Sequence, residues 1–166
     1  MNLDIERIPT AATYPLRHAI LRPHQSIGEM HYAQDDVPGT ASFGAIDRDT
    51  GDIVGVATVI PESAPFDPSV VGILPGPNGA PLTAWRLRGM AVRQDLQGQG
   101  VGALVLNRAM DHVANERGDL IWCNARARAI TFYERAGFVT FGERWEIPDI
   151  GWHVVMWRPA GISASS

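Results

Sequence analysis

The chain has 166 residues, of which 45% are hydrophobic and 19% are charged. This composition is typical of a globular domain long enough to bury a core, and it excludes a disordered chain. The formal net charge of −4 offers no basic stripe for nucleic acid. The single cysteine, Cys123, excludes an internal disulfide and a multi-cysteine metal site.

We therefore predict one domain over residues 1–166, with no metal and no nucleic-acid partner. The first ten residues are acidic and polar, unlike a signal peptide, and no apolar run approaches the ~20 residues needed to span a bilayer. The expected location is the cytoplasm, with no membrane partner. Whether the chain forms a homodimer is left open.

In the N-terminal half, residues 13–22 predict a short helix that ends before a proline, and residues 23–39 predict a polar loop. Residues 42–47 and 53–60 are rich in apolar and β-branched residues and are separated by a turn signal, which predicts a hairpin. Residues 61–81 are rich in proline and glycine and cannot continue a sheet. They predict a surface loop or a lid.

The C-terminal half begins with a predicted strand, 85–92, and a helix from about 101 to 117. The inward face of this helix is predicted to consist of Leu104, Val105, Ala109, Met110 and Val113, and Gly118 is expected at its C-terminal cap.

A buried strand over 120–124 follows, then a second helix with Ala129, Phe132, Tyr133 and Ala136 on one face. Two strands, 139–145 and 152–157, precede a tail, 160–166, that is expected to fray. The order of elements predicts an α/β fold with a mixed, mostly antiparallel central sheet of about six to seven strands flanked by helices.

The segment Gln97-Gly98-Gln99-Gly100-Val101-Gly102 lies between a predicted strand and a predicted helix. Its glycines allow tight turns and a close approach to a ligand, and the N-terminus of the helix offers unpaired N–H groups. These features predict a phosphate site. A dinucleotide-binding loop is the weaker alternative, because residues 93–96 separate the segment from its strand and Cys123-Asn124 stands where an acid is expected.

Two motifs resemble the signatures of the GNAT acyltransferase superfamily. Gln97, Gly100 and Gly102 fill the defining positions of its pyrophosphate loop, Q/R-x-x-G-x-G/A. Downstream, residues 129–138 (AITFYERAGF) match the pattern A-x-x-F-Y-x-x-x-G-F. The resemblance covers residues 84–140 well and the N-terminal half only in the order of its elements. The sequence is similar to a branch of small bacterial acetyltransferases with poorly known substrates.

The resemblance implies that acetyl-CoA is the co-substrate. Its pyrophosphate would lie on the amides of residues 97–103, and its pantetheine would pair with the backbone of Met90 and Val92, with a bulge at Gly89. The implied cofactor-binding residues are Met90, Ala91, Val92, Gln97, Gly98, Gln99, Gly100, Val101, Gly102, Ala103, Asn124 and Arg126. Many members have an asparagine, in contact with the pantetheine, at the position of Arg126. Asn124 could take over that contact, and Arg126 could reach a phosphate instead.

The resemblance also implies a role for Tyr133. When an amine attacks the thioester, CoA leaves as a thiolate with an ordinary thiol pKa of ~8.5, and a nearby hydroxyl can protonate it. The matching tyrosine of the family is this general acid. The alternative is an aromatic core residue with a satisfied hydroxyl.

The general base is not identified. Some members carry a glutamate at the position of Arg86, and an arginine stays protonated and cannot act as a base. His153, Glu146 and a water relay remain alternatives. Cys123 is expected to be a small core residue rather than a nucleophile.

The acceptor is predicted to be a small-molecule amine. Arg86 and Arg88 alternate onto one strand face and would favour a carboxylate or phosphate on the acceptor, unless they pair with acids such as Glu62 or Glu143. The predicted function is therefore an acetyl-CoA-dependent N-acyltransferase. The alternative is a catalytically silent acyl-CoA-binding sensor on the same fold.

Overall fold

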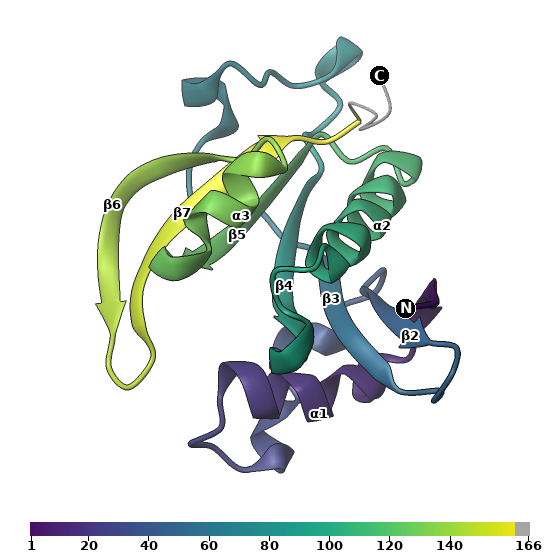
Figure 1. Cartoon of the computed structure of the whole chain (residues 1–166). Coiled ribbons are helices and arrows are strands. Elements are labelled where there is room, and N and C mark those ends of the chain that lie inside the picture. The colour runs from purple at the N-terminus through teal and green to yellow at the C-terminus, as the bar shows by residue number, and fades with distance from the viewer. Residues whose placement is uncertain (162–166) are drawn as a thin grey trace. The chain divides into compact units, whose positions relative to one another are not determined.

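The computed structural model describes residues 1–161, and its strands form one seven-stranded mixed sheet (Figure 1). The strands lie in the order β1-β2-β3-β4-β5-β7-β6. Their bounds are β1 Leu3–Ile8, β2 Ala41–Asp47, β3 Ile53–Pro61, β4 Ala84–Val92, β5 Leu120–Arg126, β6 Val139–Ile147 and β7 Gly151–Pro159. The α-helices are α1 Tyr14–Leu16, α2 Val101–Asn115 and α3 Ile130–Arg135.

The predicted mixed sheet of six to seven strands with flanking helices is confirmed. Most of the tail predicted to fray, from residue 162 onward, lies outside the described residues. None of the described helices is both long and apolar enough to cross a bilayer.

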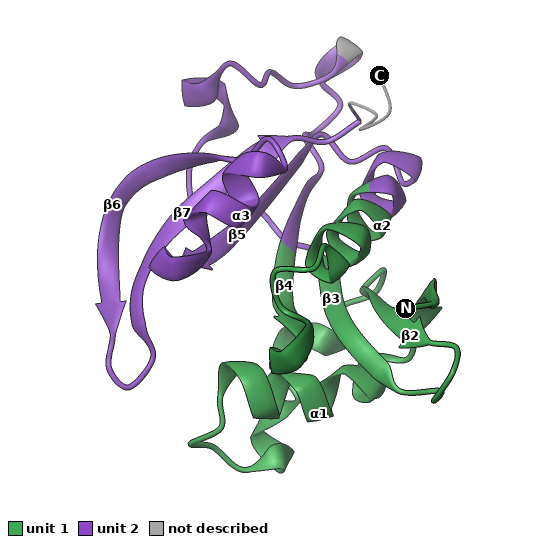
Figure 2. Cartoon of the chain, viewed as in Figure 1, with its two compact units in different colours: residues 1–60, 87–110 green, residues 61–86, 111–166 purple. Residues whose placement is uncertain are grey.

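The chain divides into two compact units (Figure 2). Unit 1 consists of residues 1–60 and 87–110, and unit 2 consists of residues 61–86 and 111–166. Both β4 and α2 pass from one unit into the other. Each unit therefore contains part of the segment in which the two sequence motifs lie.

Unit 1 contains the antiparallel strands β1, β2 and β3. The predicted hairpin is confirmed, with Ala41 paired to Val59 and Ser42 to Thr58. The sequence prediction of a helix as the first element was wrong, because β1 precedes it and pairs along its whole length with β2. Its sequence, LDIERI, alternates apolar and charged residues only over its first four positions, which is a weak signal for a strand.

The N-terminal part of α2 packs on β3 through a glycine. A β-carbon at Gly55 would lie 2.9 Å from Val101 Cγ1 and 3.3 Å from Val105 Cγ2, so only glycine allows this close approach. The prediction that Leu104 faces inward was wrong, since its exposed fraction is 47%. Leu106 is fully buried instead, because the apolar face of the helix is centred on Val105 and Ala109.

The predicted N-terminal helix is a continuous helical run composed of three kinds of turn. A 3-10 turn, Thr10–Thr13, leads into α1, and a π-helical turn, Arg17–Leu21, ends the run two residues before Pro23. The predicted polar loop that follows contains two 3-10 turns, Ile27–Met30 and Ala33–Asp36. The helical run and the loop together carry the buried side chain of Arg17.

Unit 2 contains the antiparallel pairs β5–β7 and β6–β7, and the first residues of β4 run parallel to β5. As predicted, residues 61–81 form no strand beyond Pro61, and include a 3-10 turn, Pro68–Val71, capped by Asp67. The start of this loop is anchored because Trp122 Nε1 donates to the carbonyl oxygen of Glu62 at 3.0 Å.

The C-terminus of α2 ends in a Schellman arrangement in which the left-handed residue is not the glycine. Arg117 has φ +59° and donates its N–H to Ala114, while Gly118 donates to Val113 at 2.9 Å. The predicted cap at Gly118 is therefore one residue beyond the observed left-handed residue, Arg117. Gly118 is required for a different reason: a β-carbon there would lie 2.6 Å from Val113 Cγ1 and 2.8 Å from Trp85 Cδ1.

We predict that Gly118→Ala lowers the free energy of unfolding by about 1–3 kcal/mol, because the added methyl group overpacks this site. The matched control is Gly28→Ala, since a β-carbon at Gly28 meets nothing within 4 Å and its φ also lies outside the left-handed region. Chemical denaturation of the two variants measures the difference. Equal stabilities would contradict the packing argument.

Candidate functional site

The glycine-rich segment connects β4 to α2 in unit 1 and has the backbone of an anion site. Gly98 and Gly100 have φ values of +78° and +86°, which other residues rarely adopt. A β-carbon at either position would meet no protein atom within 4 Å, so the space in front of the loop is open. The left-handed backbone, rather than crowding by the protein, explains both glycines.

Helix α2 begins directly at the end of this segment. Leu104 donates its N–H to the carbonyl oxygen of Gly100 at 3.3 Å, so Gly100 occupies the N-cap position. The N–H groups of Val101, Gly102 and Ala103 therefore belong to the first turn, where a helix supplies no backbone acceptor. The dipole of a 15-residue helix adds a positive potential at the same point.

Side chains hold the segment in this shape. Gln97 Nε2 donates to the carbonyl oxygen of Val92 at 2.9 Å, and Gln99 Nε2 donates to that of Asp95 at 3.2 Å. Arg93 donates twice to the carboxylate of Asp95, at 2.7 and 3.1 Å, and this contact lowers the pKa of Asp95. The amides of the segment are thus oriented by the chain itself before any ligand is bound.

The end of β4 contains the other cofactor-binding residues predicted in unit 1. Ala91 is buried, while Met90 and Val92 are partly exposed. Gly89 has φ +64° in the middle of the strand, and a β-carbon there would lie 2.8 Å from Arg17 Nε. The strand therefore departs from regular geometry at the predicted bulge, directly against a buried arginine.

Tyr133 lies on α3 in unit 2 and is 7% exposed. Its ring contacts those of Phe132 and Phe138, with centroids 5.0 and 5.5 Å apart. Burial raises the pKa of Tyr133 well above 10; the neighbouring Cys123 adds to this rise, and Arg126 opposes it. The hydroxyl therefore carries its proton at neutral pH, as a proton donor must.

Strand β5 contains three of the residues considered in the sequence analysis: Cys123, Asn124 and Arg126. Cys123 is buried, and burial raises its thiol pKa, so it is not a reactive thiolate. This agrees with the prediction that it is a core residue. Asn124 is exposed and Arg126 is partly exposed, opposite Val155 and His153 of β7. Their predicted contact with the cofactor remains a prediction.

The candidate bases differ in their surroundings. His153 is 6% exposed, its ring stacks on Trp145, and its Nδ1 lies 2.8 Å from the carbonyl oxygen of Gly151. Because a carbonyl oxygen only accepts, Nδ1 carries the hydrogen, and in the neutral ring the lone pair is on Nε2. Glu146 is exposed on β6.

The two arginines predicted to bind the acceptor have different partners. Within unit 2, Arg86 Nη1 lies 3.3 Å from Glu62 Oε2, and its guanidinium lies over the ring of Trp122. Glu62, one of the two acids considered as alternative partners for the arginines, is thus paired with Arg86. Within unit 1, Arg88 donates to the amide oxygen of Gln34 at 3.0 Å and lies 4.0 Å from the ring centroid of Tyr32.

Sequence reasoning missed the buried pair formed by Arg17 and Asp35. Arg17 Nη1 lies 2.6 Å from Asp35 Oδ2, and the two side chains are 0% and 2% exposed. The residues are 18 positions apart in a segment read as helix and polar loop. No motif marks them, and only the fold brings them together.

Comparisons with known proteins agree with this arrangement. A model of the acetyltransferase (GNAT) domain matches residues 38–140. The uncharacterized N-acetyltransferase YitI of Bacillus subtilis (strain 168) is 32% identical over 156 residues, which cover 94% of this chain and 95% of that protein. The chain belongs to the GNAT family of acetyltransferases.

Two solved structures show the same fold. FeeM, an N-acyl amino acid synthase from uncultured soil microbes, matches with a TM-score of 0.72 and 11% identity, over 99% of this chain and 94% of that one. An aminoglycoside 6′-N-acetyltransferase complexed with coenzyme A matches with a TM-score of 0.68 and 14% identity, over 94% and 96%. At these identities the likeness shows the fold alone. The family match makes this chain an acyl-CoA N-acetyltransferase, and the family uses acetyl-CoA.

We predict that Gly100→Val abolishes the stabilisation of the fold by acetyl-CoA. At 100 times its Kd, the ligand should add ~2.7 kcal/mol to the stability of the unmodified protein. A branched residue cannot adopt φ +86° without strain, and its side chain would enter the open space in front of the amides. Thermal unfolding with and without acetyl-CoA measures the effect.

The matched control is Gly51→Val in the β2–β3 turn, where φ is +79° and the surrounding space is also open. This variant carries the same kind of backbone strain far along the chain from the loop, so it should keep the full ligand-induced gain. If Gly100→Val also kept it, the loop would not be the phosphate site.

Proposed function

We propose that this GNAT protein transfers an acetyl group from acetyl-CoA to the amine of a small molecule by direct attack. The observation that carries the proposal is the left-handed glycine segment at the N-terminus of α2, with its amides oriented and the space before it open. The amides of Gly98 to Ala103 bind the pyrophosphate. The pantetheine lies along the strand residues Met90, Ala91 and Val92 and pairs with the backbone of Met90 and Val92.

In the proposed reaction, the amine nitrogen forms a bond to the acetyl carbonyl carbon, and the bond between that carbon and sulfur breaks. The amine loses a proton to the base, and the CoA thiolate gains one from the hydroxyl of Tyr133. Burial raises the pKa of Tyr133, so its hydroxyl carries the proton that the thiolate takes.

Three candidates remain for the general base: His153, Glu146 and a water relay. The hydrogen bond of His153 Nδ1 to the carbonyl oxygen of Gly151 leaves the lone pair on Nε2, which is the tautomer that a base requires. Arg86 is excluded as a base by its charge. Asn124 and Arg126 stay candidate contacts for the cofactor.

A free-thiol release assay with acetyl-CoA and a panel of amines tests this function. Steady thiol release with formation of an N-acetyl product supports the enzyme. Saturable binding of acetyl-CoA without thiol release across the panel would instead favour the sensor.

We predict that Tyr133→Phe lowers kcat by about 10²-fold or more, the usual contribution of a positioned acid. The Kd of acetyl-CoA should stay nearly unchanged, because phenylalanine keeps the ring contacts with Phe132 and Phe138. Single-turnover rates and a binding titration separate the two effects. An unchanged kcat would mean that Tyr133 is only a core aromatic residue.

A further inference from the structure

Three guanidinium groups gather around the ring of Tyr32 in unit 1. The Cζ atoms of Arg88, Arg17 and Arg22 lie 4.0, 4.4 and 5.7 Å from its centroid. These arginines come from β4, from the π-helical turn and from the residue after it. An aromatic ring attracts cations through its electron-rich face, but the cations repel one another, so such a cluster favours the arrival of an anion.

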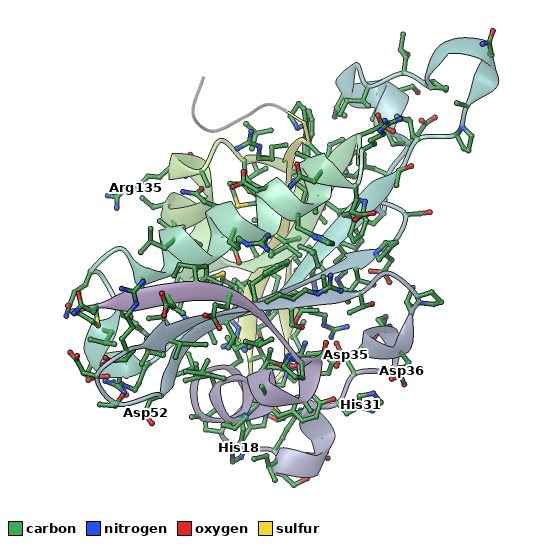
Figure 3. All side chains as sticks on the ribbon, turned by 90° about the vertical axis from the view of Figure 1, so that its right-hand side faces the viewer. His18, His31, Asp35, Asp36, Asp52 and Arg135 are labelled. Atoms are coloured by element: carbon green, nitrogen blue, oxygen red, sulfur yellow. The ribbon has the colours of Figure 1, made fainter. Side chains whose placement is uncertain are left out.

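The carboxylate of Asp35 is occupied by one of the three arginines. It accepts from Arg17 Nη1 at 2.6 Å and from Arg17 Nη2 at 3.1 Å, and Arg17 also donates to the carbonyl oxygen of Met30 and to Thr58 Oγ1. Asp35 further accepts the backbone N–H of Tyr32 at 2.9 Å. The buried pair therefore neutralises Arg17 and holds Tyr32 in place. The neighbouring Asp36 lies 3.0 Å from His31 Nε2 (Figure 3).

The other two arginines are placed differently. Arg22 and Arg88 are both partly exposed. Across residues 1–161, no carboxylate lies within ion-pair distance of Arg22. Arg88 donates to the amide oxygen of Gln34, which helps to orient its planar fork. A guanidinium fork fits the two oxygens of a carboxylate or phosphate.

We propose that Arg22, Tyr32, Gln34 and Arg88, here called the Tyr32 cluster, bind an anionic group of the acyl acceptor, either a carboxylate or a phosphate. The inference rests on the proposed transfer to a small-molecule amine. It moves acceptor recognition away from Arg86, which is paired with Glu62. Arg22 and Arg88 contact the anion, and the Arg17–Asp35 pair positions Tyr32 for them.

The test compares amines that differ only in the anionic group, as substrates of the full chain with acetyl-CoA. Amino acids are paired with their amides, and phosphoethanolamine is paired with ethanolamine. The carboxylate pairs and the phosphate pair distinguish the two anions. The unmodified protein should have a lower KM for the anionic member of at least one pair, and the amide or alcohol should be turned over poorly.

Arg22→Gln and Arg88→Gln should each raise the KM for the preferred anionic acceptor by about 10- to 100-fold, the effect of losing one hydrogen bond between charged groups. The KM for acetyl-CoA and its stabilisation of the fold should not change, which shows that the variants are folded. Arg→Lys at either position should restore part of the acceptor affinity, because it keeps the charge and loses the fork. The control is Arg48→Gln, an exposed residue of the same unit that pairs with Asp4.

An unchanged acceptor KM in both glutamine variants, with thiol release intact, would overturn the Tyr32 cluster and leave the proposed function standing. So would equal turnover of the anionic and uncharged members of every pair. Failure of every amine to release thiol would overturn the proposed function, and with it the inference that depends on it.

Discussion

A fully buried arginine keeps its charge, and burying that charge is costly unless a carboxylate faces it. Unit 1 is organised around one such pair. Arg17 and Asp35 are 0% and 2% exposed. Removal of one partner from a buried pair typically costs about 3–5 kcal/mol, because the other charge is left uncompensated. The pair thus fixes the 3-10 turn Ala33–Asp36 to the preceding helical run.

The same arginine reaches the sheet. Its Nη2 donates to Thr58 of β3 at 3.0 Å, and a hydroxyl chain continues from Thr58 to Ser42 and Thr10. Its Nε lies against Gly89, where β4 adopts a left-handed φ, and this nitrogen has no hydrogen-bond partner within residues 1–161. Glycine is the residue type that leaves room for the Arg17 side chain at position 89. The irregularity of β4 and the buried pair therefore depend on each other.

The parts of the site that could be predicted from sequence are those whose conformation depends on residues close together in the chain. The glycine segment, the start of α2 and the position of Tyr133 follow from two motifs, each of which spans only a short run of consecutive residues. The family resemblance carried by these motifs was confirmed by the comparisons. Their roles with the cofactor remain proposals.

The parts that could not be predicted depend on contacts between distant residues. Nothing near Arg22 or Tyr32 in the chain indicates that Arg88 lies on the same ring. Leu104 and Leu106 are two positions apart on α2, and which of them is buried depends on how the helix is rotated against β3. Periodicity alone leaves that rotation open. The partner of Arg86 could be named only as one of two acids, and the fold selects Glu62.

In the proposed function, unit 1 contains both a glycine segment that binds the cofactor and a segment, held by the Arg17–Asp35 pair, that recognises the acceptor. The most direct test is Asp35→Asn, which removes the charge and keeps the shape. The account predicts that the acceptor KM rises about tenfold or more, because loss of the charged partner loosens Tyr32, while the Kd of acetyl-CoA stays within about twofold. Parallel changes in both constants, or no change in either, would contradict it.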